Sequence, residues 1–150
     1  MRIQREKFDP ACHDWWRWME LWDAHAMELR SLKTRLHVDQ YLRIQQDGRL
    51  VLMSLRDEDN ILQGYSSHFW HQDLHFSLRV AQDDAWYVVP SLRNKGFGTM
   101  LRRAALDELR AEGVEIAYGR LKAAHPHDES MAELGYAPWE TVFIKDLRRG

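Results

Sequence analysis

A strand, a proline, a glycine-containing loop and a helix follow one another in Ala85-Trp86-Tyr87-Val88-Val89-Pro90-Ser91-Leu92-Arg93-Asn94-Lys95-Gly96-Phe97-Gly98-Thr99. The first amides of a helix have no carbonyl partner, and the helix dipole makes that end partly positive. Gly96 and Gly98 carry no side chain that would hold an anion away. Arg93 and Lys95 add positive charge beside them. The stretch therefore predicts a site for a phosphate or pyrophosphate, and with it an enzyme.

Two other phosphate-binding loops fit this stretch less well. A nucleotide-hydrolysing P-loop ends in Gly-Lys-Ser/Thr so that its lysine reaches the terminal phosphates, whereas Gly98 is followed by Thr99 and Met100. A dinucleotide-binding loop needs three glycines at the start of a βαβ unit, and only two are present here, after strands that read as hairpins. Pro90, directly before the loop, also does not suit that turn.

The composition is typical of a soluble globular protein. The 150 residues are enough to bury a core, and we expect a single domain over residues 1–150. A net charge of −2 argues against binding to nucleic acid or to an anionic membrane surface. No apolar run is long enough to cross a bilayer, and Cys12, the only cysteine, excludes an intrachain disulfide. These features fit a cytoplasmic protein.

The residues before position 50 predict two helices. Asp9-Pro10 is a typical helix start, and apolar residues recur at helical spacing from Trp15 to Leu29. A second, short helix is predicted from Asp39 to Gln46. The apolar stripe of the first helix is typical of core packing. Trp16 falls outside that stripe and is a candidate for lining a substrate cleft.

The remaining elements alternate between strands and helices. They are a strand over 50–53, its hairpin partner from 61 to about 70, an extended stretch within 74–80, a central strand over 85–89, a helix over 97–109 closed by Gly113, a strand over 114–118, a helix over 128–134 and a last strand over 141–147. This order predicts an α+β (mixed α/β) domain with a largely antiparallel sheet.

The glycine loop fits the pattern Val-x-Pro-x-x-Arg-x-x-Gly-x-Gly from Val88 to Gly98, and in this the chain resembles the GNAT superfamily of N-acetyltransferases. The element order and Leu134-Gly135-Tyr136 extend the resemblance over nearly the whole chain. Further matches are similar to GNAT proteins encoded by tailed phages and prophages: Gly64-Tyr65, Leu74-His75-Phe76, Ala81-x-x-Asp84 and Lys145-Asp146-Leu147. The resemblance implies a GNAT-type fold, in which helices flank a twisted, mostly antiparallel sheet that splays at its central strand.

The resemblance also implies acetyl-CoA as the acyl donor, with its pyrophosphate held by the loop. That role falls on Arg93, Asn94, Lys95, Gly96, Phe97, Gly98 and Thr99. The pantetheine arm would pair with the backbone of Val88 and Val89 like an added strand. The acetyl group would pass directly to an amine: a protein lysine, an N-terminus or a small molecule. We expect a monomer or homodimer that binds neither nucleic acid nor membrane.

Two carboxylates at the start of the central strand are the candidates for the catalytic base. The attacking amine must lose a proton, and Asp84 stands where related enzymes often place a carboxylate for this step. Asp83 is its neighbour with the opposite facing. Both also fit a structural role as caps at the strand entrance. The amide of Val88 or Val89 is the expected donor to the thioester oxygen.

The general acid and the acceptor side are less defined. Many related enzymes have a tyrosine at the position of Met131, which cannot donate a proton. His127 is a candidate acid because a histidine titrates near neutral pH, although a solvent-exposed loop histidine is the simpler interpretation. Trp16 and His75 are the candidates for the acceptor side. The missing tyrosine leaves an alternative open: a catalytically weak or inactive CoA-binding protein, such as a phage factor that binds a host target.

Two further groups of residues have more than one interpretation. His68, His71 and His75 have the residue type of a metal site, but their spacing on a strand sends them to different faces, so we expect no metal. Arg102-Arg103 either reaches the 3′-phosphate of CoA or belongs to a solvated helix face.

Overall fold

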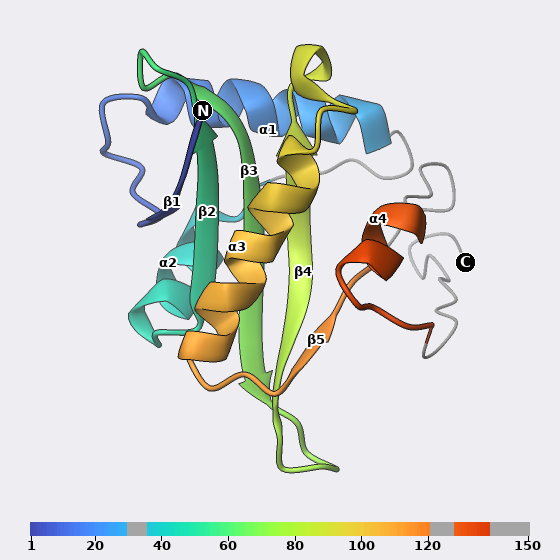
Figure 1. Ribbon diagram of the computed structural model, residues 1–150. Coiled ribbons are helices and arrows are strands. Elements are labelled where there is room, and N and C mark those ends of the chain that lie inside the picture. Colours follow the sequence, from blue (N-terminus) through green and yellow to red (C-terminus); the bar gives the residue numbers. More distant parts are fainter. Residues whose placement is uncertain (30–35, 121–127, 139–150) are drawn as a thin grey trace, which may run out of the picture. The chain divides into compact units, whose positions relative to one another are not determined.

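Figure 1 shows a computed structural model of the chain, which describes residues 1–29, 36–120 and 128–138. The chain divides into two compact units, Met1–Arg120 and Leu121–Gly150. In the described residues, the first unit holds the sheet, the glycine loop and three α-helices, and the second holds a short helix.

The first unit is built on a five-stranded sheet whose strands lie in chain order. Neighbours pair antiparallel from β1 to β4, and β4 pairs with β5 in parallel. The strands are β1 (Arg2–Glu6), β2 (Leu50–Arg56), β3 (Leu62–Gln72), β4 (Arg79–Val88) and β5 (Ile116–Tyr118). The prediction of an α+β domain with a mostly antiparallel sheet is confirmed.

Helices cover both faces of this sheet (Figure 1). On one face, α3 (Phe97–Ala111) packs its apolar side onto a core that includes Val51 of β2. On the other face, α1 (Trp15–Leu29) and α2 (Val38–Gln46) pack onto a core that includes Leu52. Successive side chains of a strand point to opposite faces, so β2 supplies both cores and every one of its residues is buried. None of the described helices has the length and apolar content to cross a membrane.

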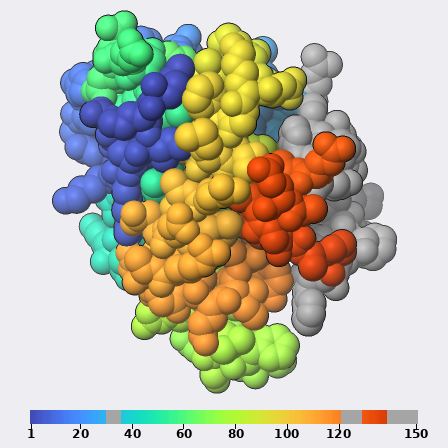
Figure 2. Space-filling view, in the orientation of Figure 1, coloured from blue at the N-terminus to red at the C-terminus, as the bar shows by residue number. Residues whose placement is uncertain are grey.

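The structure corrects the boundaries of several strands. β1 is an edge strand with the sequence Arg-Ile-Gln-Arg-Glu, and it has no apolar alternation that would predict it. β4 begins at Arg79, well before the predicted start at Ala85. Between β3 and β4 the chain turns around Asp73, so the predicted extension of residues 74–80 is right only from Arg79 onward. The turn forms the light green projection at the bottom of Figure 2.

A bulge interrupts the pairing of β3 and β4. Ser67 pairs with Ala85 and His68 pairs with Asp83, which leaves Asp84 as an extra residue on β4. A bulge of this kind locally breaks the ladder and re-aims the side chains beside it. It lies at the two carboxylates that the sequence marked as candidate bases.

The described part of the second unit is a helix and its end. α4 (Asp128–Glu133) is followed by Gly135, which has φ +82°. The amide of Tyr136 returns to the carbonyl of Met131 at 3.0 Å, which is a common way to close a helix on a glycine. The predicted helix and its glycine stop are confirmed. The predicted strand over residues 141–147 lies outside the described residues.

Candidate active site

The glycine loop joins the end of β4 to the start of α3 (Figure 1). A 3-10 turn, η1 (Pro90–Leu92), follows the strand, and residues 93–96 are exposed. The first hydrogen bond into α3 runs from the Met100 amide to the Gly96 carbonyl, at 3.0 Å. The amides of residues 97–99 therefore come before the helical hydrogen bonds, which is the arrangement that an anion site needs.

The two glycines of the loop meet different structural demands. Gly96 has φ +80°, and a β-carbon there would meet nothing within 4 Å, so this position needs the backbone freedom of glycine and borders open space. At Gly98 a β-carbon would lie 2.7 Å from the indole of Trp86 on β4. Gly98 thus allows α3 to approach the sheet. The expectation that both glycines chiefly make room for an anion therefore describes Gly96 better than Gly98.

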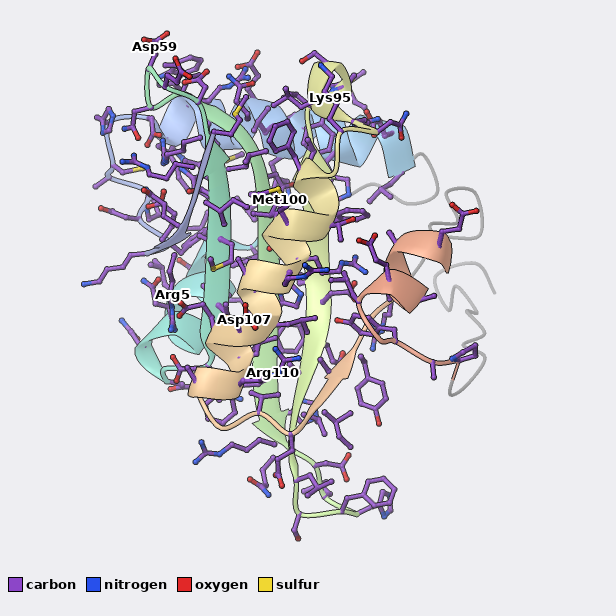
Figure 3. The ribbon with its side chains drawn as sticks, viewed as in Figure 1. Arg5, Asp59, Lys95, Met100, Asp107 and Arg110 are labelled. Carbon is purple, nitrogen blue, oxygen red and sulfur yellow. The ribbon has the colours of Figure 1, made fainter. Side chains whose placement is uncertain are left out.

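The side chain of Arg93 is turned back toward the strand. Its Nε donates to the Val88 carbonyl at 2.8 Å, and its Nη2 lies 2.8 and 3.0 Å from the carboxylate oxygens of Glu28 on α1. The guanidinium also lies over the ring of Tyr87, 5.2 Å from its centre. Arg93 thus ties the loop to α1 and β4. Lys95 lies in the exposed part of the loop (Figure 3).

One edge of β4 has no strand partner over its second half in the part of the chain that the structure describes. β5 pairs with β4 only over Val80 to Gln82, opposite residues 116–118. β4 itself continues to Val88. The predicted splay of the sheet begins where this pairing stops.

Val88 and Val89 present their backbone groups to opposite sides of β4. The Val89 amide donates to the Gln63 carbonyl at 3.0 Å, on the β3 side. Backbone hydrogen bonds of an antiparallel pair alternate from residue to residue, so Val88 directs its amide and carbonyl to the open edge. The bond from Arg93 to the Val88 carbonyl agrees with this direction. Of the two expected amide donors, only that of Val88 faces the open edge.

Asp84 is held by two hydroxyl groups from different elements. Ser67 on β3 donates to its Oδ2 at 2.8 Å, and the Tyr41 hydroxyl on α2 donates to the same oxygen. Burial and the neighbouring Asp84 carboxylate raise the pKa of Tyr41 far above its usual value, so the phenol stays protonated and remains a donor. Among the described residues, Oδ1 has no hydrogen-bond partner, and Asp84 is exposed. One carboxylate oxygen is thus left for a ligand.

Asp83 lies on the α3 side of the strand, and both of its oxygens are occupied. Oδ2 lies 3.3 Å from Arg102 Nη2, and Oδ1 accepts the Arg120 amide at 2.9 Å. The side chains of Asp83 and Arg102 are only 8% and 3% exposed. Burial raises the pKa of Asp83 above its usual range, against the opposing effect of Arg102. The predicted opposite facing of the two carboxylates is borne out by these contacts, and Arg102 is not at the surface where a CoA phosphate would meet it.

Aromatic side chains fill the α1/α2 side of the sheet beside Asp84. Tyr41 packs edge-on against Trp22, with ring centres 5.5 Å apart, and Trp22 stacks on Tyr65 at 5.0 Å. The Tyr65 hydroxyl lies 3.0 Å from His25 Nδ1. This packing fixes the position of Tyr41. The sequence prediction missed Tyr41 and Ser67, because neither belongs to a motif and their proximity to Asp84 depends on how the helices and strands pack.

The two residues expected on the acceptor side lie away from Asp84. Trp16 is at the beginning of α1, 63% exposed, and lines a cavity of about 140 Å³ with Ile61 of the β2–β3 turn. Glu28, which contacts Arg93, lies near the other end of that helix. His75 belongs to the turn between β3 and β4. This turn lies at the opposite end of β4 from the glycine loop (Figure 1). The structure does not bring Trp16 or His75 to the open edge.

The other histidines do not form a metal site in the described residues. His68 is buried, and burial together with Arg102 lowers its pKa to about 3, so it is neutral. No group of three potential ligands occurs in residues 1–29, 36–120 and 128–138. His127, the candidate acid, lies outside the described residues, and Met131 belongs to α4 in the second unit.

Comparison with known proteins places this geometry in a family. The sequence matches the acetyltransferase (GNAT) family over residues 10–136. No curated protein is significantly similar to the chain in sequence.

Several solved structures share the fold at low sequence identity. Glucosamine-6-phosphate N-acetyltransferase from Arabidopsis thaliana is 11% identical, with a TM-score of 0.71 over 97% of each chain. Ribosomal-protein-alanine N-acetyltransferase from Brucella melitensis biovar Abortus 2308 is 16% identical, with a TM-score of 0.67 over 97% of this chain and 100% of that one. An aminoglycoside acetyltransferase from an uncultured soil metagenomic sample, in complex with sisomicin, is 13% identical, with a TM-score of 0.73 over 97% and 95%.

Proposed function

The chain belongs to the acetyltransferase (GNAT) family, and from this premise we propose that it transfers the acetyl group of acetyl-CoA directly to an amine, with Asp84 as the base. Family membership makes it an acyltransferase. One observation supports the rest of the proposal. Within the described residues, a carboxylate with one unpaired oxygen, an open strand edge and helix amides without a hydrogen-bond partner all lie along β4 and its loop.

The loop and the strand edge fit the two ends of the CoA donor. A pyrophosphate at the amides of residues 97–99 would border Gly96, where the structure leaves open space. The pantetheine arm would pair with the Val88 carbonyl as an added strand does, which leaves the Val88 amide for the thioester oxygen. Arg93 would then release the Val88 carbonyl, which it contacts at 2.8 Å in this structure. Lys95, at the exposed part of the loop, supplies further positive charge.

The chain's own residues account for the proton and the developing charge. Asp84 Oδ1 accepts a proton from the amine, directly or through water, while Tyr41 and Ser67 hold Oδ2 in place. The amine nitrogen attacks the thioester carbonyl; the C–N bond forms, the C–S bond breaks and the thiolate leaves. The Val88 amide donates to the oxygen on which charge develops. The thiolate takes its proton from solvent, since Met131 cannot supply one.

The acceptor proposed here is an amine on a small molecule, a protein lysine or an N-terminus. An ammonium group is attracted by the exposed Asp84 carboxylate, which supports an amine over an alcohol. The related structures are named for acting on a sugar phosphate, a ribosomal-protein alanine and aminoglycosides, so the fold alone does not select among these classes. Trp16 and His75 remain candidates only for a large acceptor, because both lie away from the open edge.

The test is binding followed by transfer. Calorimetry with acetyl-CoA is expected to show binding that weakens when Gly96 is replaced by valine, because a bulky residue strains a left-handed backbone and fills the open side of the loop. Mass spectrometry of a panel of amines with labelled acetyl-CoA then reports transfer. No binding at millimolar acetyl-CoA contradicts the proposal.

The alternative function, a CoA-binding protein without catalysis, is favoured by one observation, the methionine at position 131. Tight CoA binding with no label transferred to any amine of the panel, in the wild type as in Asp84→Asn, would support it.

The remaining parts of the proposal are a cytoplasmic enzyme, one domain and a relationship to phage-encoded proteins. A single domain is supported by the family match, which crosses from the first unit into the second. The cytoplasmic location is supported by the single cysteine, and a phage or prophage relationship by the short matches at Gly64-Tyr65 and Leu74-His75-Phe76. Light scattering distinguishes the expected monomer from a homodimer.

A further inference from the structure

We propose that Asp83 and Arg102 are positioning residues that fix the point where β4 and β5 separate and hold the start of α3 against it. The inference rests on the proposed CoA site, which needs the open edge of β4 and the first amides of α3 at a fixed spacing. It gives Asp83 a task other than that of a catalytic base.

Asp83 lies at the point of separation. The β4–β5 pairing ends at Gln82 and Tyr118, and Asp83 is the next residue of β4. Its Oδ1 accepts the Arg120 amide at 2.9 Å, so a side chain takes over where the backbone ladder stops. Arg120 Nη2 also donates to Gln82 Oε1 at 2.7 Å. These two contacts hold the chain beyond β5 beside β4 and limit how far the separation extends.

Arg102 continues this connection to the glycine loop. Its Nη2 lies 3.3 Å from Asp83 Oδ2, and its guanidinium lies over the Trp86 ring, 4.4 Å from the centre. The same indole is the surface against which Gly98 packs, where a β-carbon would lie 2.7 Å away. A continuous series of contacts therefore runs from the separation of the strands to the N-terminus of α3: Arg120, Asp83, Arg102, Trp86 and Gly98.

Stability alone does not explain a charged pair in this position. Taking two charges out of water costs much of what their attraction returns, and an apolar pair of the same volume often serves stability as well. A charged pair adds direction: the carboxylate bonds the Arg120 amide with one oxygen and Arg102 with the other. That geometry sets distances among β4, β5 and α3. The consequence is that Asp83 and Arg102 affect CoA affinity without touching CoA.

Calorimetry with coenzyme A on the full chain tests this inference. Asp83→Asn is nearly isosteric and keeps an acceptor for the Arg120 amide, but it loses the charge that holds Arg102. We expect coenzyme A to bind about tenfold more weakly to it. Arg102→Lys keeps the charge without the planar guanidinium, and a weakening of similar direction is expected. Asp107→Asn is the matched control, because Asp107 forms an exposed ion pair with Arg110 on the same helix (Figure 3).

A second readout separates positioning from mere loss of stability. The indole N–H resonance of Trp86, assigned with Trp86→Phe, is expected to move when coenzyme A binds the wild type, and to move less in folded Asp83→Asn. All measurements are made well below the thermal unfolding midpoint of each variant. If the wild type binds coenzyme A and Asp83→Asn binds it equally well, the inference is overturned while the proposed function stands. If the wild type does not bind, the proposed function itself fails.

Discussion

Asp83 and Asp84 are neighbours in the chain, but their side chains point to opposite faces of β4 and so lie in two different regions of the molecule. On the α3 side, Asp83 is buried, and both of its oxygens are bonded to protein groups. On the α1/α2 side, Asp84 is exposed, with one oxygen anchored by Tyr41 and Ser67. In the first region, Asp83 connects β4 to α3 and to the chain after β5. In the second region, Asp84 is available to a ligand. What each carboxylate can do therefore depends on the face of the strand that it occupies, and not on its residue type.

The largest expected effect comes from replacing Asp84, the carboxylate that is available to a ligand. Asp84→Asn is expected to lower kcat for amine acetylation by about 10²–10⁴-fold, because the amine loses its proton acceptor. Affinity for coenzyme A and the unfolding midpoint stay near wild type. Steady-state release of the CoA thiol, with an amine found in the acceptor panel, measures the change. An equal or larger loss of kcat in Asp83→Asn, with unchanged CoA affinity, would reverse the assignment of the two carboxylates.

The second-largest expected effect comes from removing the ion pair between Asp83 and Arg102. Arg102→Met is expected to destabilise the fold by about 3 kcal/mol, because it leaves Asp83 buried without its charged partner. Urea unfolding measures this. Arg110→Met is the matched control: its ion pair with Asp107 is 70% and 65% exposed, and the expected change is within about 0.5 kcal/mol. Similar losses of unfolding free energy in the two variants would show that the Asp83–Arg102 ion pair contributes no more to stability than an exposed pair does.

The two glycines of the loop sharpen the same contrast. Gly98→Ala is expected to cost about 1–3 kcal/mol of stability, because the added methyl meets the Trp86 indole. Gly96→Ala is expected to cost about 1 kcal/mol through its left-handed backbone and to act more on CoA binding. Thermal unfolding and calorimetry on both variants separate the two effects. The cost of Gly98→Ala shrinks when Trp86→Leu is also present; a cost that does not change would contradict the packing explanation.

The smallest expected effect is a pH dependence of stability. Burial raises the pKa of Asp83 above its usual value of 3.8, against the effect of Arg102. Between the usual pKa of an aspartate and the raised pKa of folded Asp83, the folded chain keeps the carboxyl proton and the unfolded chain does not. The contribution of Asp83 to stability therefore falls as the pH rises through this window. Subtracting the unfolding free energies of Asp83→Asn from those of the wild type, over a series of acidic to neutral pH values, isolates the term. A difference that grows with pH would contradict the sign.

Glu6, a carboxylate whose pKa is shifted in the opposite direction, serves as an internal reference. Burial raises the pKa of Glu6, but hydrogen bonds from Ser54, Gln4 and Arg56 outweigh it, so the net pKa is lowered. The contribution of Glu6 to stability is therefore present above the usual pKa of a glutamate and is lost as the pH falls. Glu6→Gln is expected to remove a loss of stability that appears as the pH falls. Asp83→Asn is expected to remove a loss of stability that appears as the pH rises.

Local patterns predicted the elements that depend on nearby residues. The glycine loop, α3 and the end of α4 at Gly135 follow from helical apolar spacing and glycine stops. The apolar spacing also predicted α1, but that helix begins at Trp15 and not at the predicted Asp9-Pro10 start. β1 was beyond such patterns, because a short polar edge strand is defined by its pairing with β2 and not by its own sequence. The bulge at Asp84 has the same origin: it exists only in the register between β3 and β4.

The residues of the candidate site also differ in whether local sequence patterns could predict them. A motif identifies the proposed loop residues, and the resemblance to related enzymes points to Asp84, but the structure places Asp84 within β4 (Arg79–Val88) and not at the strand entrance. Tyr41 lies 43 residues from Asp84 in sequence and Ser67 lies 17, so their contacts with it follow from how α2 and β3 pack. The structure does not bring Trp16 and His75 to the site, because the lengths of α1 and β4 carry them to other ends of the first unit.

A titration of the isotopically labelled protein with coenzyme A, followed by amide NMR, tests directly whether CoA binds at the open edge of β4 and the glycine loop. We expect the largest shifts at the Val88 amide, on the open edge of β4, and at the amides of residues 96–99. The amides of the turn at residues 73–78 should not move. Unchanged Val88 and loop amides at millimolar coenzyme A, or shifts confined to the cavity beside Trp16, would contradict the account.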